Sequence, residues 1–129
     1  DIIHVHGWMA AMLPIYMKHF YKNEALFSDT KIVTSVYSQS FEGTLDIEMI
    51  NKIKFDGVPN ESISDLETPD YESIMRATIN HSDAVIIASE NLSSSLTKFI
   101  ESSGKPFLPF ASKDAFSEAY TNFYKNEVL

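Results

Sequence analysis

The sequence predicts an α/β fold, a Rossmann-like parallel sheet of about four strands with helices on both faces. Runs rich in β-branched residues alternate with segments whose apolar residues recur at helical spacing. This strand-then-helix unit occurs four times, and such alternation implies a parallel sheet with crossover helices. The run 84–88 is apolar throughout, which is typical of a strand buried on both faces. We expect a single partial domain over residues 1–129.

The first unit is a strand over 1–6 followed by a helix. The strand ends at Gly7, and apolar side chains then recur at helical spacing from Trp8 onward. Pro14 favours a helix start near Ala10, or a kink, because proline has no backbone N–H to donate inside a helix. The chain opens on a strand without a methionine, so we expect it to begin within a domain.

The second unit begins with a strand over 31–37 that is rich in β-branched residues. The segment 38–68 is predicted to be an irregular insertion, with a short helix starting near Asp46 and a turn at 56–57. A stronger helix start follows at 68–70, where Thr-Pro-Asp supplies a capping oxygen, a proline for the first turn and an early acid.

The third strand spans 84–88, and residues 89–91 offer caps for the helix that follows it. That helix is expected to end at Gly104, where a left-handed backbone carries no Cβ penalty. The fourth strand, 107–110, contains one proline and follows another, which favours a place at the sheet edge. The last helix is expected to start at 112–114.

Composition excludes several classes of function. The 18 acidic residues outnumber the 10 basic ones, and the formal charge of -8 leaves no clustered basic face for nucleic acid. There is no cysteine, so disulfides and thiolate metal sites are excluded. No apolar run approaches the roughly 20 residues that span a bilayer. We expect no membrane partner, no cofactor and a cytoplasmic location.

Ligands of parallel sheets bind beyond the carboxyl ends of the strands. In this chain those ends are 6–8, 37–39 and 89–91. Trp8 has two interpretations, stacking on a sugar ring or packing between helix and sheet, and its place in the apolar pattern favours packing. Gly7 has the position of an anion-binding turn, but a single glycine falls far short of a nucleotide-binding motif.

His4 and His6 form the pattern most typical of metal ligands. Two residues apart on a strand, their side chains share a face and would hold zinc if a third ligand arrived. The spacing brings neither His19 nor His81 to the pair, so local packing is favoured and a zinc-binding module is the weaker alternative. No serine lies in a nucleophile elbow, and the acidic residues of 42–70 are interpreted as solvated surface.

Three segments together resemble the glycogen and starch synthases. They are Asp-Ile-Ile-His-Val-His-Gly-Trp-Met-Ala at 1–10, Lys-Ile-Val-Thr-Ser-Val-Tyr at 31–37 and His-Ser-Asp-Ala-Val-Ile-Ile-Ala-Ser-Glu at 81–90. The family has His-x-His-Asp-Trp, Thr-Val-His-Asn and Ala-Asp-x-Val-x-x-Val-Ser at these places. The resemblance implies the second half of the first Rossmann-like domain of a GT-B glycosyltransferase, similar to short bacterial versions that lack the second domain.

That family transfers glucose from ADP-glucose or UDP-glucose to an α-1,4-glucan, in a cleft between two domains. The resemblance places His6, Gly7, Trp8, Tyr37 and Ser38 as candidates for the substrate cleft, and it assigns none of them as catalytic. Gly7 stands where the family has aspartate, and Tyr37 stands where it has histidine. The family's cations for the leaving diphosphate lie in parts that this chain does not contain.

Two functional hypotheses follow. The first is a fragment similar to a glycogen or starch synthase, nominally a glucosyltransferase with α-glucan and nucleotide-glucose as partners, that does not catalyse transfer by itself. The second is a non-catalytic interaction or glucan-binding module that forms homo-oligomers through an open sheet edge beside strand 1–6. An unpaired strand edge supports the second hypothesis because it offers free N–H and C=O groups to another chain.

Overall fold

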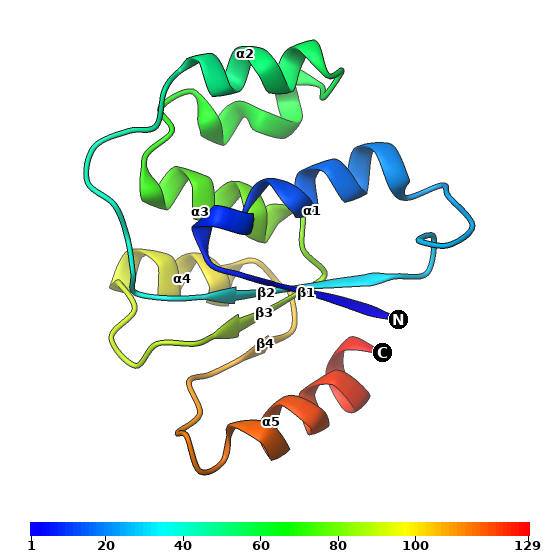
Figure 1. The fold of residues 1–129 in the computed structure, drawn as a ribbon. Helices are drawn as coiled ribbons and strands as arrows, with labels where there is room; N and C mark the ends of the chain where they lie inside the picture. Colours follow the sequence, from blue (N-terminus) through cyan, green and yellow to red (C-terminus); the bar gives the residue numbers. More distant parts are fainter.

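The computed structural model describes residues 1–129 and confirms the parallel α/β sheet. Its strands are β1 (Ile2–His6), β2 (Lys31–Val36), β3 (Ala84–Ile87) and β4 (Phe107–Leu108). They lie in the order β1-β2-β3-β4 and every neighbouring pair is parallel (Figure 1). The carboxyl ends of all the strands therefore meet at one rim of the sheet.

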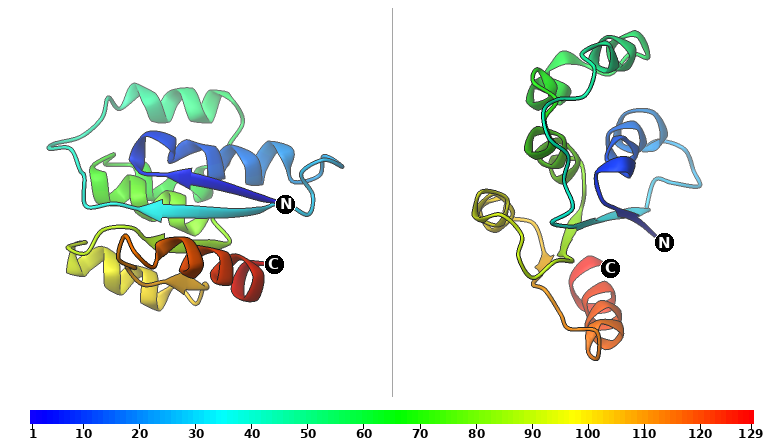
Figure 2. Two further views of the ribbon diagram at one scale, coloured as in Figure 1. Left: turned by 60° about the horizontal axis from the view of Figure 1, so that its bottom comes forward. Right: turned by 60° about the vertical axis from the view of Figure 1, so that its left-hand side comes forward.

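Helices cover both faces of the sheet, as predicted. The crossover helices α1 (Met12–Tyr16), α3 (Tyr71–Asn80) and α4 (Ser94–Ser102) lie on one face (Figure 1). α5 (Phe116–Phe123) and the π-helical turn η4 (Tyr124–Val128) lie on the other face (Figure 2). Because the crossovers stay on one face while the strands advance in one direction, all three connections have the same hand.

The central strand β2 is buried because it is covered on both sides. Its side chains alternate, so Val36 packs against α3 and α4 while Val33 packs against α5 and η4. Its buried Thr34 is satisfied by Ser82, whose Oγ lies 2.7 Å from the threonine hydroxyl. The run of β-branched residues that predicted this strand is thus also what fills the core on its two faces.

The helix expected after Gly7 is divided into three parts. η1 (Trp8–Ala10) is a 3-10 turn, α1 is a short α-helix, and η2 (Met17–Tyr21) is a π-helical turn. Pro14 lies in the first turn of α1 and has no N–H to donate to the carbonyl of Ala10, so a continuous α-helix through η1 and α1 is excluded.

No helix of the chain has the length and apolar character needed to cross a bilayer.

The segment 38–68 contains more regular structure than the irregular insertion that was expected. The short helix expected after Asp46 is α2 (Glu48–Phe55), and Asp46 Oδ1 accepts from the Glu48 N–H at 2.9 Å. The 3-10 segment η3 (Asn60–Leu66) follows, and both elements pack as an outer layer on α1 and α3 (Figure 2). Their shared core contains the buried residues Ala11, Ile15, Ile50, Ile53, Val58, Ile63, Leu66, Ile74 and Ala77.

The helix α3 starts close to the predicted place, but the roles predicted within 68–70 are wrong, because Thr68 is not the cap and Pro69 lies before the first turn. Asp70 is its N-cap, and its Oδ1 accepts from the Ser73 N–H at 2.8 Å, so this acid has a structural role rather than being plain surface. The predicted cap of α4 at 89–91 is wrong. That cap is Ser93, whose Oγ accepts from the Leu96 N–H at 3.3 Å.

The last two elements are shorter than predicted. β4 ends at Leu108 rather than at residue 110, because Pro109 has no N–H for the ladder. α5 begins at Phe116 rather than at 112–114, after a turn in which the Phe116 N–H donates to the carbonyl of Ser112 at 2.9 Å. β4 is nevertheless the edge strand that its prolines predicted.

Lys105 joins the loop before β4 to the end of α3. Its Nζ donates to the carbonyls of Ile79 at 2.8 Å and Asn80 at 2.7 Å, and also to the carbonyl of Ser82. A cation at a helix C-terminus satisfies carbonyls that have no partner in the helix and faces the negative end of its dipole. This contact therefore fixes α3 against the strands that follow it.

Replacing Lys105 with methionine should lower the free energy of unfolding by about 1 to 3 kcal/mol, because three carbonyls lose a charged donor while the apolar stem is kept. Urea unfolding followed by circular dichroism measures the change. The matched control is Lys98→Met, at an exposed position on α4, which should change stability by less than about 0.5 kcal/mol. Equal stabilities of the two variants would contradict this role of Lys105.

Candidate functional site

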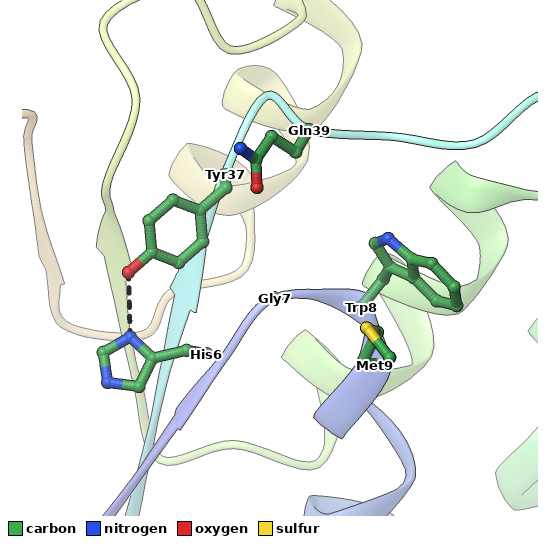
Figure 3. A pocket seen from close by; sticks show the side chains of 6 residues that line it. All are labelled: His6, Gly7, Trp8, Met9, Tyr37 and Gln39. Carbon is green, nitrogen blue, oxygen red and sulfur yellow. Dashed lines mark hydrogen bonds between the residues drawn. The ribbon is translucent and has the colours of Figure 1, made fainter.

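A cleft opens at the carboxyl rim of the sheet, beyond the ends of β1 and β2 (Figure 3). Its volume is about 290 Å³, and its lining residues are His6, Gly7, Trp8, Met9, Tyr37 and Gln39. Parallel sheets bind their ligands at this rim. The volume is at the lower end of the range for ligand pockets, which suits a small unit such as one sugar ring.

Gly7 turns the chain out of β1 in a backbone conformation that only glycine adopts readily. Its φ is 71° and its ψ is -176°. There is room for a side chain, because the nearest atom to an added Cβ would be Tyr37 Cδ2, at 3.9 Å. Glycine is therefore favoured here by the backbone conformation and not by lack of space. Its N–H donates to the carbonyl of Ser35 at 3.0 Å. Gly7 is therefore a turn residue, as favoured, and its amide is not free to bind an anion because it already donates to Ser35.

Trp8 packs between the helices and the sheet, and it also lines the cleft where a ligand could stack on it. It is half-buried and packs against the two core clusters on the α3 face, with its ring centre 4.7 Å from that of Phe41. It also lines the cleft, beside Gly7 and on the side away from His6 (Figure 3). The packing holds the indole in place, so any ligand in the cleft meets a preorganised aromatic wall.

The cleft is connected to the C-terminal end of the chain through aromatic side chains. Tyr37 Oη lies 2.9 Å from His6 Nδ1 (Figure 3), and the rings of His6 and His4 stack with centres 4.1 Å apart. His4 Nε2 lies 2.6 Å from Ser35 Oγ, and His4 Nδ1 is hydrogen-bonded to the hydroxyl of Tyr124. Both ring nitrogens of His4 therefore have protein partners.

Burial is the larger cause and the charge of the neighbouring His6 the smaller, and together they lower the pKa of His4 to about 4. His4 is therefore neutral at pH 7. The two histidines share a face as predicted, but they pack and hydrogen-bond locally. No group of three or more histidine and carboxylate side chains is placed to hold a metal ion.

No lysine or arginine lines the cleft. Arg76, the only arginine, lies instead between α3 and α4. Its Nη2 donates to Glu72 Oε2 at 3.3 Å and to Ser95 Oγ at 3.0 Å, and its guanidinium carbon lies 5.6 Å from the ring centre of Phe99. A diphosphate in the cleft would have no lysine or arginine to pair with.

The structure brings together four of the five residues predicted for the cleft: His6, Gly7, Trp8 and Tyr37. Ser38 lies in a neighbouring hollow, because side chains alternate along the extended segment after β2. Two lining residues were not among the predicted cleft residues. Gln39 lies two residues after Tyr37 on an extended segment, so its side chain points to the same side and could have been predicted. No pattern in the neighbouring residues marks Met9 as a cleft residue.

Comparison with known proteins places the chain in a family. Residues 1–104 match the family described as the starch synthase catalytic domain. The chain belongs to this family. The matched region includes β1, β2 and β3 and therefore every residue that lines the cleft, whereas α5 and η4 lie beyond it.

The similar curated proteins are glycogen synthases. The chain is 30% identical over 93 residues to the glycogen synthase of Clostridium perfringens, covering 70% of this chain and 19% of that protein. It is 30% identical over 100 residues to that of Elusimicrobium minutum, covering 75% of this chain and 20% of that protein. The chain thus spans about a fifth of the length of these relatives. No solved structure matches it.

The His4 environment predicts a loss of stability in mild acid. Its pKa of about 4 in the folded state lies below the usual 6.5, so between these values the unfolded chain binds the proton more readily. Stability is therefore full above pH 6.5 and declines as the pH falls toward 4. Since the ring is only half-buried, we expect a contribution of about 1 to 2 kcal/mol between pH 7 and 5.

Urea unfolding of the His4→Gln variant at pH 7 and pH 5 tests this assignment. The free energy of unfolding that the parent chain loses between these pH values should be about 1 to 2 kcal/mol smaller in the variant. The matched control is His6→Gln, which removes the exposed histidine and should keep most of the loss, because burial is the larger cause of the shifted pKa. An unchanged pH dependence in His4→Gln would contradict the assignment.

Proposed function

We propose that this chain forms one wall of the sugar-binding cleft of a GT-B glucosyltransferase similar to glycogen synthase, and that it does not transfer glucose by itself. Its ligand is the α-1,4-glucan rather than the nucleotide of the donor. The single observation that carries the proposal is the cleft at the strand ends, with an aromatic wall and no lysine or arginine. Membership of the starch synthase family supports the choice of sugar chemistry.

Aromatic residues favour a sugar over a nucleotide diphosphate in this cleft. The indole of Trp8 and the ring of Tyr37 present flat apolar surfaces that cover the C–H face of a sugar ring. Gln39 supplies amide donors and acceptors for hydroxyl groups. A neutral polyhydroxyl ligand satisfies these groups without bringing an unpaired charge into a chain of formal charge -8.

Lack of catalysis by the chain alone follows from the charge requirement of the reaction. Glucose leaves a nucleotide diphosphate, and the developing negative charge needs preorganised donors or cations. The cleft contains no lysine or arginine, the Gly7 amide is bonded to Ser35, and Arg76 is engaged by Glu72, so no cation is placed to take this charge. In relatives about five times longer, the remaining parts of the protein are available to supply them.

Two assays test this proposal with the purified chain. Radiolabelled ADP-glucose and UDP-glucose with glycogen should give no transfer, and measurable transfer would refute the inactivity. Titration with maltose, the α-1,4-linked disaccharide, should give saturable binding that weakens about tenfold in Trp8→Leu, a loss of about 1.4 kcal/mol. The control is Phe55→Leu, a 91% exposed aromatic on α2, which should bind like the parent chain.

The second candidate function is assembly of two copies through the edge of the sheet. β1 pairs with β2 alone, so its other edge is open. Beside it, the chain that follows β1 carries an apolar groove of about 520 Å³, lined by Met9, Ala10, Met12, Leu13, Tyr16 and Tyr21. An open edge next to exposed apolar side chains is typical of an interface.

Light scattering over a range of concentrations tests the assembly. The parent chain should form a dimer at high concentration, and Leu13→Glu should remain monomeric because a charge in the groove is costly to bury. Leu26→Glu, at a position that is 76% exposed and outside the groove, is the matched control and should still dimerise. A parent chain that stays monomeric throughout would rule this function out.

A further inference from the structure

His6 is the cleft residue that lies at an open edge of the sheet. It ends β1, which pairs with β2 alone, and its side chain is exposed. Exposed side chains change rotamer rapidly, and fixing one during binding weakens the affinity for a ligand. The hydrogen bond between His6 Nδ1 and Tyr37 Oη (Figure 3) therefore depends on what holds the imidazole ring in place.

The ring of His4 supplies that support. The two histidines lie on the same face of β1, two residues apart. Their rings stack with centres 4.1 Å apart and with 27° between their planes. A stacked neighbour restricts the rotamers of the outer ring and leaves its nitrogens free to form hydrogen bonds. The orientation of His6 therefore depends on the orientation of His4.

His4 is itself held at both ring nitrogens. Its Nε2 lies 2.6 Å from Oγ of Ser35 on β2, and its Nδ1 is hydrogen-bonded to the hydroxyl of Tyr124 on η4. The Tyr124 ring also lies edge-on to the imidazole, with 82° between the two planes. Turning the imidazole would break both hydrogen bonds. The C-terminal turn thus determines how this ring is oriented on the sheet.

Tyr37, the cleft wall at the other end of this chain of contacts, is held at two points. Its backbone carbonyl accepts from the Tyr71 hydroxyl of α3, and its own hydroxyl is bonded to His6. The first contact fixes the backbone of the wall from the α3 face of the sheet. The second fixes the direction of the Tyr37 ring from the face that η4 covers. Both faces therefore contribute to the shape of the cleft.

We propose that Tyr124 is a positioning residue of the cleft. Its hydroxyl fixes His4, the stack passes that orientation to His6, and the hydrogen bond passes it to Tyr37. Tyr124 does not line the cleft, so it acts only through these side chains. It also lies beyond residues 1–104, the region that matches the family. This inference rests on the proposed function, because it concerns the geometry of the same cleft.

Tyr124→Phe tests this role, since it keeps the aromatic ring and removes only the hydroxyl. NMR of the isotope-labelled chain without ligand should show changed signals for His4 Nδ1, His6 Nδ1 and the Tyr37 ring. A purely structural role of Tyr124 would not move the last two signals. Affinity for maltose, measured by isothermal titration, should fall about threefold to tenfold, because the cleft wall is no longer preorganised.

The matched control is Tyr16→Phe, which also removes one hydrogen-bonded tyrosine hydroxyl. Tyr16 Oη donates to Asp56 Oδ2 at 2.8 Å, on the α3 side of the sheet. Tyr16 does not line the cleft and makes no contact with His4. This variant should therefore keep the histidine signals and the maltose affinity of the parent chain.

The outcomes separate the positioning role from the proposed function. If Tyr124→Phe changes the His4 signal alone and binds maltose like the parent, the positioning role is refuted and the proposed function stands. Equal losses of affinity in Tyr124→Phe and Tyr16→Phe would also refute it. If the parent does not bind maltose but the His6 and Tyr37 signals still change in Tyr124→Phe, the proposed function fails and the coupling of Tyr124 to the cleft stands.

Discussion

Parallel pairing of β1, β2 and β3 in a single direction determines where every other part of this molecule lies. Val5 pairs with Thr34, and Thr34 pairs with Val85. The ladder continues to the rim, where the Gly7 N–H donates to Ser35 and the Ala88 N–H donates to Val36. Since each strand end is held by its neighbour, the segments that follow emerge side by side. The cleft and the neighbouring hollow that contains Ser38 are the spaces between these segments.

The second face of the sheet is closed by a part of the chain outside the region that matches the family. α5 and η4 place Phe123 and Val128 against Val33 and Ile86, and Tyr124 hydrogen-bonds to His4. The neutral state of His4 is thus linked to burial by the C-terminal helix. Through stacking with His6, the same contact supports one side of the cleft. The packing of the C-terminal helix on the sheet therefore also helps to position the side chains at the rim.

Charge distribution connects the fold to the choice of ligand. Two of the cations best placed for strong pairing serve the scaffold: Lys105 caps α3, and Arg76 binds Glu72 between α3 and α4. The rim is left with aromatic rings, hydroxyls, amides and the Glu72 carboxylate, and with no lysine or arginine. Such groups bind neutral hydroxyl-rich molecules through apolar contact and hydrogen bonds, and they give little to a phosphate.

Sequence alone determined the local features of this protein. Three strands, the approximate start of α3 and the break caused by Pro14 follow from patterns within a few neighbouring residues, and the residues at the strand ends made the rim predictable. Tertiary structure alone decided which side chains meet there. The contact of His4 with Tyr124 spans 120 positions, and Ser38 turns away from Tyr37 into a separate hollow. Such contacts depend on how helices pack on the sheet, and no local period encodes that packing.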